Sequence, residues 1–256
     1  MSVARQDQRG RELVHQRPAW ILPALVALAV TAFSGLFLYY YFGPTPEEIL
    51  GHTPRASAAS RQIEVIVGGS RFLIPENFTR YPAQRHGGTE PEIAMHALLP
   101  DFAPWSPDLQ SDFTDNSPDA NVIFFSLAET RSTLPAAQRL KEIYAHYLTT
   151  SKPEATVSGL EKFTFRDDSG YRDQDLFVGK DHFNRIILLI CQHTTPLIQS
   201  PNCSRTLLLA RNLAFTYRYK RAHLREWQRI DELITRKVAS FEAPGLPSDL
   251  EGTIND

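Results

Sequence analysis

The sequence predicts an α+β protein in which an N-terminal transmembrane helix is followed by an antiparallel-sheet domain with two packed amphipathic helices. Three observations support this fold class. Residues 18–46 contain no charged side chain. Short runs of aliphatic and aromatic residues then recur between turn residues, which is typical of antiparallel strands. Two later segments, 135–149 and 224–241, repeat apolar residues every three or four positions, as amphipathic helices do.

The charge-free segment predicts a helix that crosses a membrane. Its apolar part, residues 19–42, exceeds the length of about 20 residues that a helix needs to cross the hydrocarbon layer. Trp20 and the aromatic run 39–42 stand at its two ends, where membrane interfaces favour such rings. A cleaved signal peptide is the alternative, but its apolar part is typically about 7–15 residues long. We therefore expect residues 18–42 to be an uncleaved anchor in the lipid bilayer.

The residues on either side of this helix predict its orientation. Glu47 and Glu48 follow it closely, and the first basic residue after it is Arg55. The segment before it is rich in arginine and contains Arg5, Arg9, Arg11 and Arg17. By the positive-inside rule, residues 1–17 form a cytoplasmic tail and the main domain lies on the outer side of the membrane.

Both cysteines, Cys191 and Cys203, lie in this outer part, where disulfides form and persist. The residues between them include Pro196 and Pro201 and predict a loop between two apolar strands. A disulfide at the base of that loop stabilises the fold by about 2–3 kcal/mol. Free thiols and a metal site are the alternatives, and a metal needs more ligands than the one nearby candidate, His193.

Composition divides the outer part into a linker, one domain and a tail. Residues 43–62 contain several prolines and an alanine- and serine-rich run, which is typical of a linker. Residues 63–241 have the length and apolar content of a single α+β domain. Residues 242–256 are rich in proline and glycine and are expected to be a flexible tail.

Strands are expected wherever apolar runs stand between turn residues. Gly68 and Gly69 separate the first two strands and predict a β-hairpin, and residues 167–170 predict another turn. Within 213–220, alternate residues from Leu213 onward are apolar or aromatic, so one face is expected to be buried. The expected strands are 63–67, 71–74, 93–98, 121–127, 162–166, 175–178, 185–191, 206–210 and 213–220.

The first amphipathic helix is expected over 135–149. Ser132 or Thr133 is expected to cap it, and Pro135 suits its first turn. The second helix, 224–241, carries Trp227 on its apolar face and charged residues on the remaining positions. Because a Trp at this spacing usually packs in the core, we interpret it as a core residue rather than a ligand platform.

Charge and motifs exclude several function classes. Without the tail 1–17, the chain carries 23 basic and 27 acidic residues, whereas a nucleic-acid-binding protein needs a basic face. The sequence contains no P-loop, GxGxxG, HExxH or GxSxG motif, so we predict no cofactor, metal or catalytic residue.

Four nearby aspartates could be calcium ligands: Asp167, Asp168, Asp173 and Asp175. The EF-hand order of ligands is absent, however, so a solvated turn is the favoured interpretation.

A long surface loop, residues 101–119, is the first candidate binding site. A loop of this length is unusual unless it binds something. Phe102 and Trp105 are residue types that anchor protein interfaces, and Asp108 and Asp112 accompany them. The alternative for Trp105 is that it packs back onto the domain.

The second candidate is the segment 80–88, RYPAQRHGG, which is polar, glycine-rich and basic. Arg85 and His86 are expected to contact an acidic or anionic partner. The alternative is a mobile loop that binds nothing.

A different function class is an envelope hydrolase. Asp173, Asp175 and His182 would supply acid and base groups if a hairpin brought them into one pocket. This hypothesis requires that the three side chains converge and are buried, so we expect an enzyme less than a binding protein.

The segments RFLIPENFTRY, RHGG, HALLPDFAPWSPD and LAFTYRYKRAHLREWQRIDELI resemble uncharacterised bacterial membrane-anchored periplasmic proteins, over residues 63–241. The resemblance implies a single-pass inner-membrane protein with a periplasmic α+β domain, and it implies no activity and no site residue.

The leading interpretation is a binding module with a protein partner in the envelope, such as an immunity-like protein that blocks a toxin, or an accessory subunit. A purely structural subunit of an envelope assembly is a further alternative.

Overall fold

The computed structural model of the chain describes residues 18, 20–131, 134–156 and 158–243. The chain consists of two units, residues 1–49 and residues 50–256. The predicted cytoplasmic tail 1–17, the predicted capping residues Ser132 and Thr133, and residues 244–256 of the predicted flexible tail lie outside the described residues.

The first unit contains α1 (Ile21–Phe42) and the short helix α2 (Pro46–Ile49). Among the described residues, α1 is the one helix long and apolar enough to cross a membrane. The Thr31 hydroxyl donates a hydrogen bond to the Ala27 carbonyl oxygen at 2.9 Å, so this polar group is satisfied within the helix, as an apolar surrounding demands. A membrane anchor and a signal sequence both have a helix of this kind.

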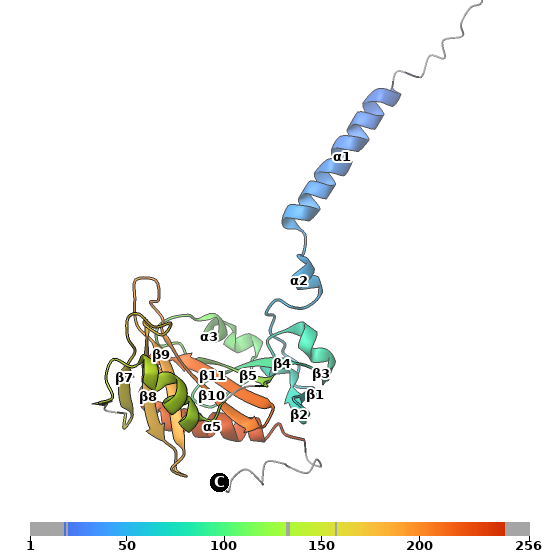
Figure 1. The fold of residues 1–256 in the computed structure, drawn as a ribbon. Coiled ribbons are helices and arrows are strands. Elements are labelled where there is room, and N and C mark those ends of the chain that lie inside the picture. The colour runs from blue at the N-terminus through green and yellow to red at the C-terminus, as the bar shows by residue number, and fades with distance from the viewer. Residues whose placement is uncertain (1–17, 19, 132–133, 157, 244–256) are drawn as a thin grey trace, which may run out of the picture. The chain divides into compact units, whose positions relative to one another are not determined.

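The second unit is built on an eight-stranded sheet with the strand order β4-β5-β11-β10-β9-β8-β7-β6 (Figure 1). Every pairing in this sheet is antiparallel, which confirms the predicted fold class. Its strands are β4 (Glu92–Leu98), β5 (Val122–Glu129), β6 (Glu154–Ala155), β7 (Glu161–Thr164), β8 (Gln174–Lys180), β9 (Ile186–Gln192), β10 (Asn202–Ala210) and β11 (Leu213–Lys220).

A smaller sheet has the order β2-β1-β3 and consists of β1 (Gln62–Val67), β2 (Ser70–Pro75) and β3 (Gly88–Thr89). The predicted hairpin around Gly68 and Gly69 is present, and both glycines have positive φ angles, 57° and 85°, as a tight two-residue turn requires. A Cβ on Gly68 would lie 2.7 Å from the Asn212 carbonyl oxygen. Glycine at this position therefore lets the hairpin turn approach the β10–β11 connection.

Two helical segments cover opposite faces of the large sheet. The helix α5 (Trp227–Ala239) buries Trp227, Ile230, Ile234 and Val238 in the main core, against the face that carries Phe215 and Tyr217. The segment 136–147 packs through Leu140 and Tyr144 on the other face, against Leu176 and Leu188. Figure 1 shows α5 in red and the 136–147 segment in yellow-green.

The predicted helix 135–149 is broken into three pieces. These are α4 (Ala136–Gln138), a π-helical turn, η4 (Arg139–Ile143), and a 3-10 turn, η5 (Tyr144–Tyr147). The helix ends at Tyr147 because the next residues join the sheet: Leu148 bridges Phe165, and the Thr149 amide donates to the Thr164 carbonyl oxygen at 2.9 Å. The expectation of a helix as far as residue 149 was therefore wrong at its end.

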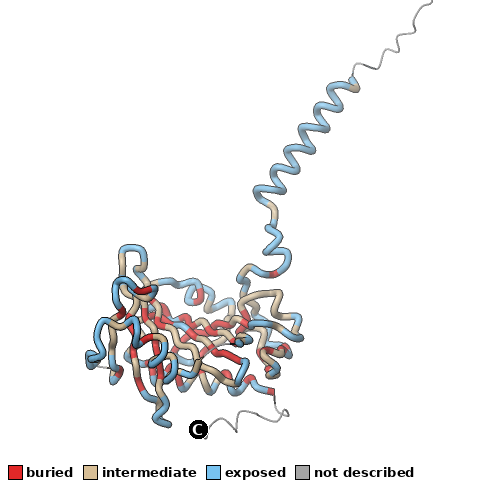
Figure 2. Tube along the Cα trace, viewed as in Figure 1, coloured by how far each residue is buried: buried red, intermediate tan, exposed pale blue. Residues whose placement is uncertain are grey.

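The remaining short helical elements are η1 (Glu76–Phe78), η2 (Pro82–His86), η3 (Pro107–Leu109), α3 (Gln110–Thr114) and η6 (Arg221–Glu226). The last of them precedes α5, so the predicted second helix begins as a 3-10 turn. Figure 2 shows that the buried residues concentrate along the central strands of the large sheet. The predicted core position of Trp227 is confirmed, and its Nε1 donates to the Ser158 carbonyl oxygen at 3.0 Å.

Part of the predicted linker 43–62 is attached to the second unit. The Arg55 amide donates to the Arg80 carbonyl oxygen at 2.8 Å, and Gly51 accepts from the Ala83 amide at 3.1 Å. At the other end of the domain, the Ala243 amide donates to the Arg71 carbonyl oxygen at 3.0 Å. The ordered domain thus extends beyond the predicted 63–241 on both sides.

Cys191 and Cys203 pair as a disulfide between β9 and β10, where they occupy directly opposed register positions. Both are buried. The bond closes the loop 192–202, which we call the stapled loop. The predicted disulfide is the arrangement present, rather than free thiols or a metal site.

Replacing both cysteines with alanine is expected to lower the free energy of unfolding by about 2–3 kcal/mol, because the unfolded chain regains the freedom of the open loop. Urea unfolding of the full-length protein in detergent, followed by circular dichroism, measures the change. Reductant should destabilise the wild type and leave the double variant unaffected. Equal unfolding midpoints for the two proteins without reductant would contradict the prediction.

Candidate functional site

The segment 101–119 folds back onto the sheet and is not an open loop. Phe102 has a φ of 59°, and its side chain is buried in the main core, with its ring centroid 5.4 Å from that of Phe125. Only 4% of Phe102 is exposed. The expectation that Phe102 serves as a surface anchor is therefore wrong, because tertiary packing takes its ring into the domain.

The other predicted residues of this segment are divided between packing and solvent. Trp105 is half-buried and packs on a small cluster that contains Leu98 and Phe113, which is the alternative that the sequence left open. Asp108 lies on η3 and Asp112 on α3, and both are exposed. The two carboxylates remain predicted contact residues on the surface of the segment.

The stapled loop lies beside the end of this segment. The Ser200 hydroxyl donates to the Ser117 carbonyl oxygen at 2.9 Å, and the two stretches line one hollow of about 650 Å³. At the tip of the loop, Leu197 is 96% exposed, a greater fraction than for any other large apolar side chain in the described residues. Leu197 is not among the contact residues predicted from the sequence. The sequence signal for Leu197 is the preceding Thr195-Pro196, because Pro favours the second position of a turn and turns between strands lie on the surface.

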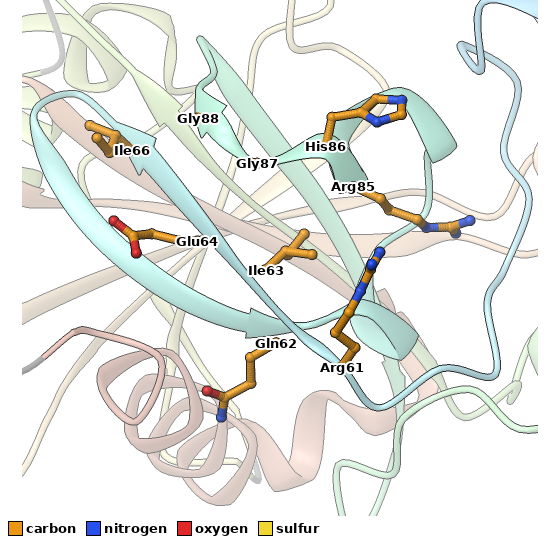
Figure 3. Close-up of a pocket in the computed structure, with 9 residues that line it drawn as sticks. All are labelled: Arg61, Gln62, Ile63, Glu64, Ile66, Arg85, His86, Gly87 and Gly88. Atoms are coloured by element: carbon orange, nitrogen blue, oxygen red, sulfur yellow. The ribbon is translucent and has the colours of Figure 1, made fainter.

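Arg85 and His86 line a second hollow, of about 520 Å³, at the edge of β1 (Figure 3). Figure 3 shows Arg61 and Arg85 at the same end of it. Gly87 has a φ of 74°, and a Cβ there would lie 2.7 Å from the Glu64 carbonyl oxygen. This glycine lets the chain pass from η2 into β3 close against β1, which explains why the sequence RHGG forms the wall of the hollow.

The positive charge of this hollow is balanced within the domain. Glu76 pairs with Arg61 at 2.9 Å and lies 4.0 Å from Arg85. Burial raises the pKa of Glu76, but hydrogen bonds from Ser57 and Arg61 outweigh it and hold the pKa below its ordinary value. Arg85 Nε also donates to Thr79 Oγ1 at 2.8 Å. Arg85 thus holds neighbouring segments together, and His86 is the exposed member of the predicted pair.

The residues proposed for a hydrolase do not converge. Asp175 is buried at the start of β8, whereas His182 is exposed in the turn after the end of that strand. The five residue steps from Asp175 to the end of β8 at Lys180 already span roughly 16 Å of extended strand. Asp173 is exposed and lies 3.7 Å from Arg172. The structure therefore contradicts the predicted acid–base cluster, because the three residues lie on different parts of the hairpin.

Asp175 instead belongs to a cluster that braces the stapled loop. Its carboxylate accepts hydrogen bonds from Arg221 at 2.7 Å and from His193 at 3.0 Å. Burial raises the pKa of Asp175, but these two bonds outweigh it and hold the pKa below its ordinary value. Arg221 also donates to the Gln192 carbonyl oxygen at 2.7 Å. The His193 contact was missed because β8–β9 register, rather than sequence spacing, brings it to Asp175.

In the part of the chain that the structure describes, no group of three or more His, Cys, Asp or Glu side chains is placed to hold a metal ion. The four aspartates considered as calcium ligands are separated between the turn 167–173 and the buried start of β8. The candidate binding surfaces are therefore the two hollows described above, with the exposed Leu197 beside one of them and Arg85 in the wall of the other.

Comparison with solved structures shows where this fold occurs. Smlt3025, an immunity protein of the Stenotrophomonas maltophilia type IV secretion system, aligns with 72% of this chain and 94% of its own at 14% identity, with a TM-score of 0.52. The iron-regulated outer membrane lipoprotein FrpD of Neisseria meningitidis aligns with 74% of this chain and 96% of its own at 11% identity, with a TM-score of 0.44. At such identities the first likeness shows the fold alone. No protein-family model and no curated protein matches the sequence.

Proposed function

We propose that this chain is a membrane-anchored interaction module of the bacterial envelope that binds a protein partner, as an immunity protein does. In this proposal α1 is an uncleaved anchor in the inner membrane, residues 1–17 are cytoplasmic and the α+β domain is periplasmic. Three features support it: the length and apolar character of α1, the paired cysteines, which favour an oxidising compartment, and the fold shared with an immunity protein.

The observation that carries the proposal is the rigid presentation of Leu197. Thr195 and Ile198 exchange two backbone hydrogen bonds, of 3.0 and 3.1 Å, across the turn that holds it. The Thr195 hydroxyl accepts a further bond from the Ile198 amide at 3.0 Å. The disulfide and the Asp175 cluster brace the base of the same loop.

A leucine held in this way is suited to insertion into an apolar pocket of a partner. Burying a leucine side chain gains about 1.5–3 kcal/mol. A preordered turn loses little conformational freedom on binding, so most of that gain appears as affinity. Beside it, the hollow shared with the end of the 101–119 segment adds the polar side chains of Asn116, Ser117 and Gln199, which suit the polar rim around such an anchor.

The test is crosslinking of the full-length protein in native membranes, with identification of the captured protein and reciprocal purification. We expect one specific partner for the wild type and a loss of about tenfold or more in affinity for Leu197→Asp, because a charge replaces the buried leucine. Leu197→Met should retain the partner. Phe183→Asp is the matched control, since Phe183 is 67% exposed in the turn at the opposite end of β9.

Two results would count against the proposal. A monomer with no captured protein would remove the interaction function. Equal capture by wild type and Leu197→Asp would remove the stapled loop as the binding surface. Recovery in a large complex of fixed stoichiometry would instead identify an accessory or structural subunit.

A further inference from the structure

A third hollow, of about 300 Å³, lies on the outer face of β4, β5 and β11, the face opposite α5. Phe124 is part of its lining, and the guanidinium groups of Arg80 and Arg218 both lie over the Phe124 ring. The Arg80 Cζ is 4.6 Å from the ring centroid and the Arg218 Cζ is 4.9 Å from it. We call the surface formed by these three residues the arginine hollow.

The backbone holds both arginines in place. Phe124 and Arg218 are directly opposed in the β5–β11 register. Arg80 is fixed by two backbone hydrogen bonds, one from its amide to the Ala94 carbonyl oxygen at 3.0 Å and one from the Arg55 amide at 2.8 Å. The two cations are therefore brought together by the fold and not by the flexibility of their side chains.

The charges of the arginine hollow are unpaired. Among the described residues, neither Arg80 nor Arg218 forms an ion pair or donates a side-chain hydrogen bond, whereas Arg205 pairs with Asp231 and Arg221 with Asp175. Burial, and then the charge of Arg218, lower the pKa of Arg80. Arg80 is half-buried and Arg218 is exposed. Two like charges over one ring raise the energy of the unbound protein, and an anion bound to both of them lowers it.

The lining of the hollow indicates the kind of anion. Glu92 also lines it, so its three charged groups sum to a single positive charge, which suits one carboxylate better than a dianion. Guanidinium groups bind a planar carboxylate through two parallel hydrogen bonds. Tyr81 and the half-buried hydroxyl-bearing Ser126 and Thr216 complete a surface for an amino-acid side chain.

We infer that the arginine hollow binds the carboxylate of an aspartate or glutamate side chain presented by the partner protein. This inference rests on the proposed function and names the chemistry of the partner. The hollow in Figure 3 is less suited to this role, because Arg61 and Arg85 already share Glu76.

The first test uses N-acetylglutamate amide as probe and NMR of full-length protein in phosphatidylcholine nanodiscs. We expect saturable shifts at Phe124 and Ser126 and none with N-acetylglutamine amide. Arg80→Gln combined with Arg218→Gln should weaken binding about 10- to 100-fold, as removal of charge-assisted hydrogen bonds does. Arg172→Gln is the matched control, because Arg172 is 69% exposed and lies outside the hollow. Absence of saturable shifts, or equal shifts with the glutamine probe, would overturn the inference.

Nanodiscs that contain phosphatidylglycerol test the alternative anion, a lipid headgroup. Shifts that depend on both arginines with this lipid, and are absent with the glutamate probe, would assign the hollow to a lipid headgroup and overturn the inference. If the double glutamine variant does not fold, Arg80→Lys with Arg218→Lys keeps the charges and removes the planar fork. That variant is expected to bind the probe several-fold more weakly than wild type. Unchanged binding would show that the planar guanidinium fork is not needed, which contradicts a contact through two parallel hydrogen bonds.

The captured partner distinguishes the two proposals. If it binds the double glutamine variant as tightly as the wild type, the inference fails while the interaction function stands. If wild type captures no protein, the function fails whatever the hollow binds.

Discussion

Replacing Asp231 with alanine is expected to lower the free energy of unfolding by about 3–5 kcal/mol, because it leaves the guanidinium of Arg205 buried without its counter-charge. Asp231 lies on the buried side of α5 and pairs with Arg205 of β10. Their side chains are 13% and 10% exposed. Tyr217 of β11 donates its hydroxyl to the same carboxylate at 2.6 Å.

The same substitution also removes the acceptor of a buried hydroxyl. Burial raises the pKa of Tyr217, so its hydroxyl keeps its proton and needs an acceptor at every pH at which the protein is studied. An unsatisfied buried donor costs about 1–3 kcal/mol, part of which is already included in the loss of the carboxylate. Asp231 therefore connects α5 to two strands of the sheet at once.

Urea unfolding at pH 7 measures the effect, and two variants test its cause. Glu232→Ala is the matched control on the same helix, since Glu232 is half exposed and its pair with Arg236 spans 3.8 Å; we expect a change below about 1 kcal/mol. Arg205→Met with Asp231→Leu removes both charges and should recover the stability lost to the unpaired guanidinium, while the Tyr217 hydroxyl still lacks its acceptor and keeps a deficit of about 1–3 kcal/mol. A double variant as unstable as Asp231→Ala would show that the lost contact, and not the unpaired charge, is responsible.

Asp231 also shows how far the sequence predicts the fold. The alternation in 213–220 correctly places Phe215 and Tyr217 in the core, and the helical spacing does the same for Trp227. The spacing also assigns Asp231 to the charged positions of the helix, although the residue is buried. Local periodicity predicts which face is apolar, but it contains no information about an arginine on a distant strand that neutralises a carboxylate there.

The candidate site was less predictable for the same reason. Aromatic residues in a long connection suit either a binding surface or a core, and Phe102 proves to be core. The basic segment 80–88 lines a hollow through Arg85 and His86, and its expected contact with an anionic partner stays a prediction. However, its first residue lies over Phe124, where a strand far along the chain brings Arg218. Such a pairing depends on strand order, which sequence spacing does not show.

Acidification is expected to destabilise the domain through His96, which is 8% exposed on β4. Burial, and then the charges of Arg80 and Arg85, lower the pKa of His96 from 6.5 to about 4. Unfolded His96 therefore binds a proton near pH 6.5, whereas folded His96 binds one only near pH 4. Between these values the unfolded state holds more protons, so lowering the pH shifts the equilibrium toward unfolding.

The stability that depends on this residue is complete above about pH 6.5 and lost below about pH 4. Since one pH unit corresponds to about 1.4 kcal/mol, the loss amounts to about 3 kcal/mol. Urea unfolding of wild type and His96→Leu at pH 7 and pH 4 measures this loss. We expect the free energy of unfolding to fall less between pH 7 and pH 4 for His96→Leu than for wild type. His182→Gln, a change in an exposed turn, should keep the wild-type difference. Equal differences for wild type and His96→Leu would contradict the assignment.

His96 also connects the pH dependence to the arginine hollow. It is directly opposed to Phe124 in the β4–β5 register, and the charge of Arg80 is one cause of its lowered pKa. Arg80→Gln should therefore raise the pKa of His96 measured by NMR, and a carboxylate bound beside Arg80 should raise it as well, because both reduce the positive potential at the imidazole. A His96 pKa that rises with the N-acetylglutamate amide probe in wild type, but not in the Arg80→Gln, Arg218→Gln variant, would show that the anion is bound between the two arginines. If the pKa of His96 is the same in Arg80→Gln as in wild type, the charge of Arg80 does not act on His96, and binding in the arginine hollow is not coupled to the titration of His96.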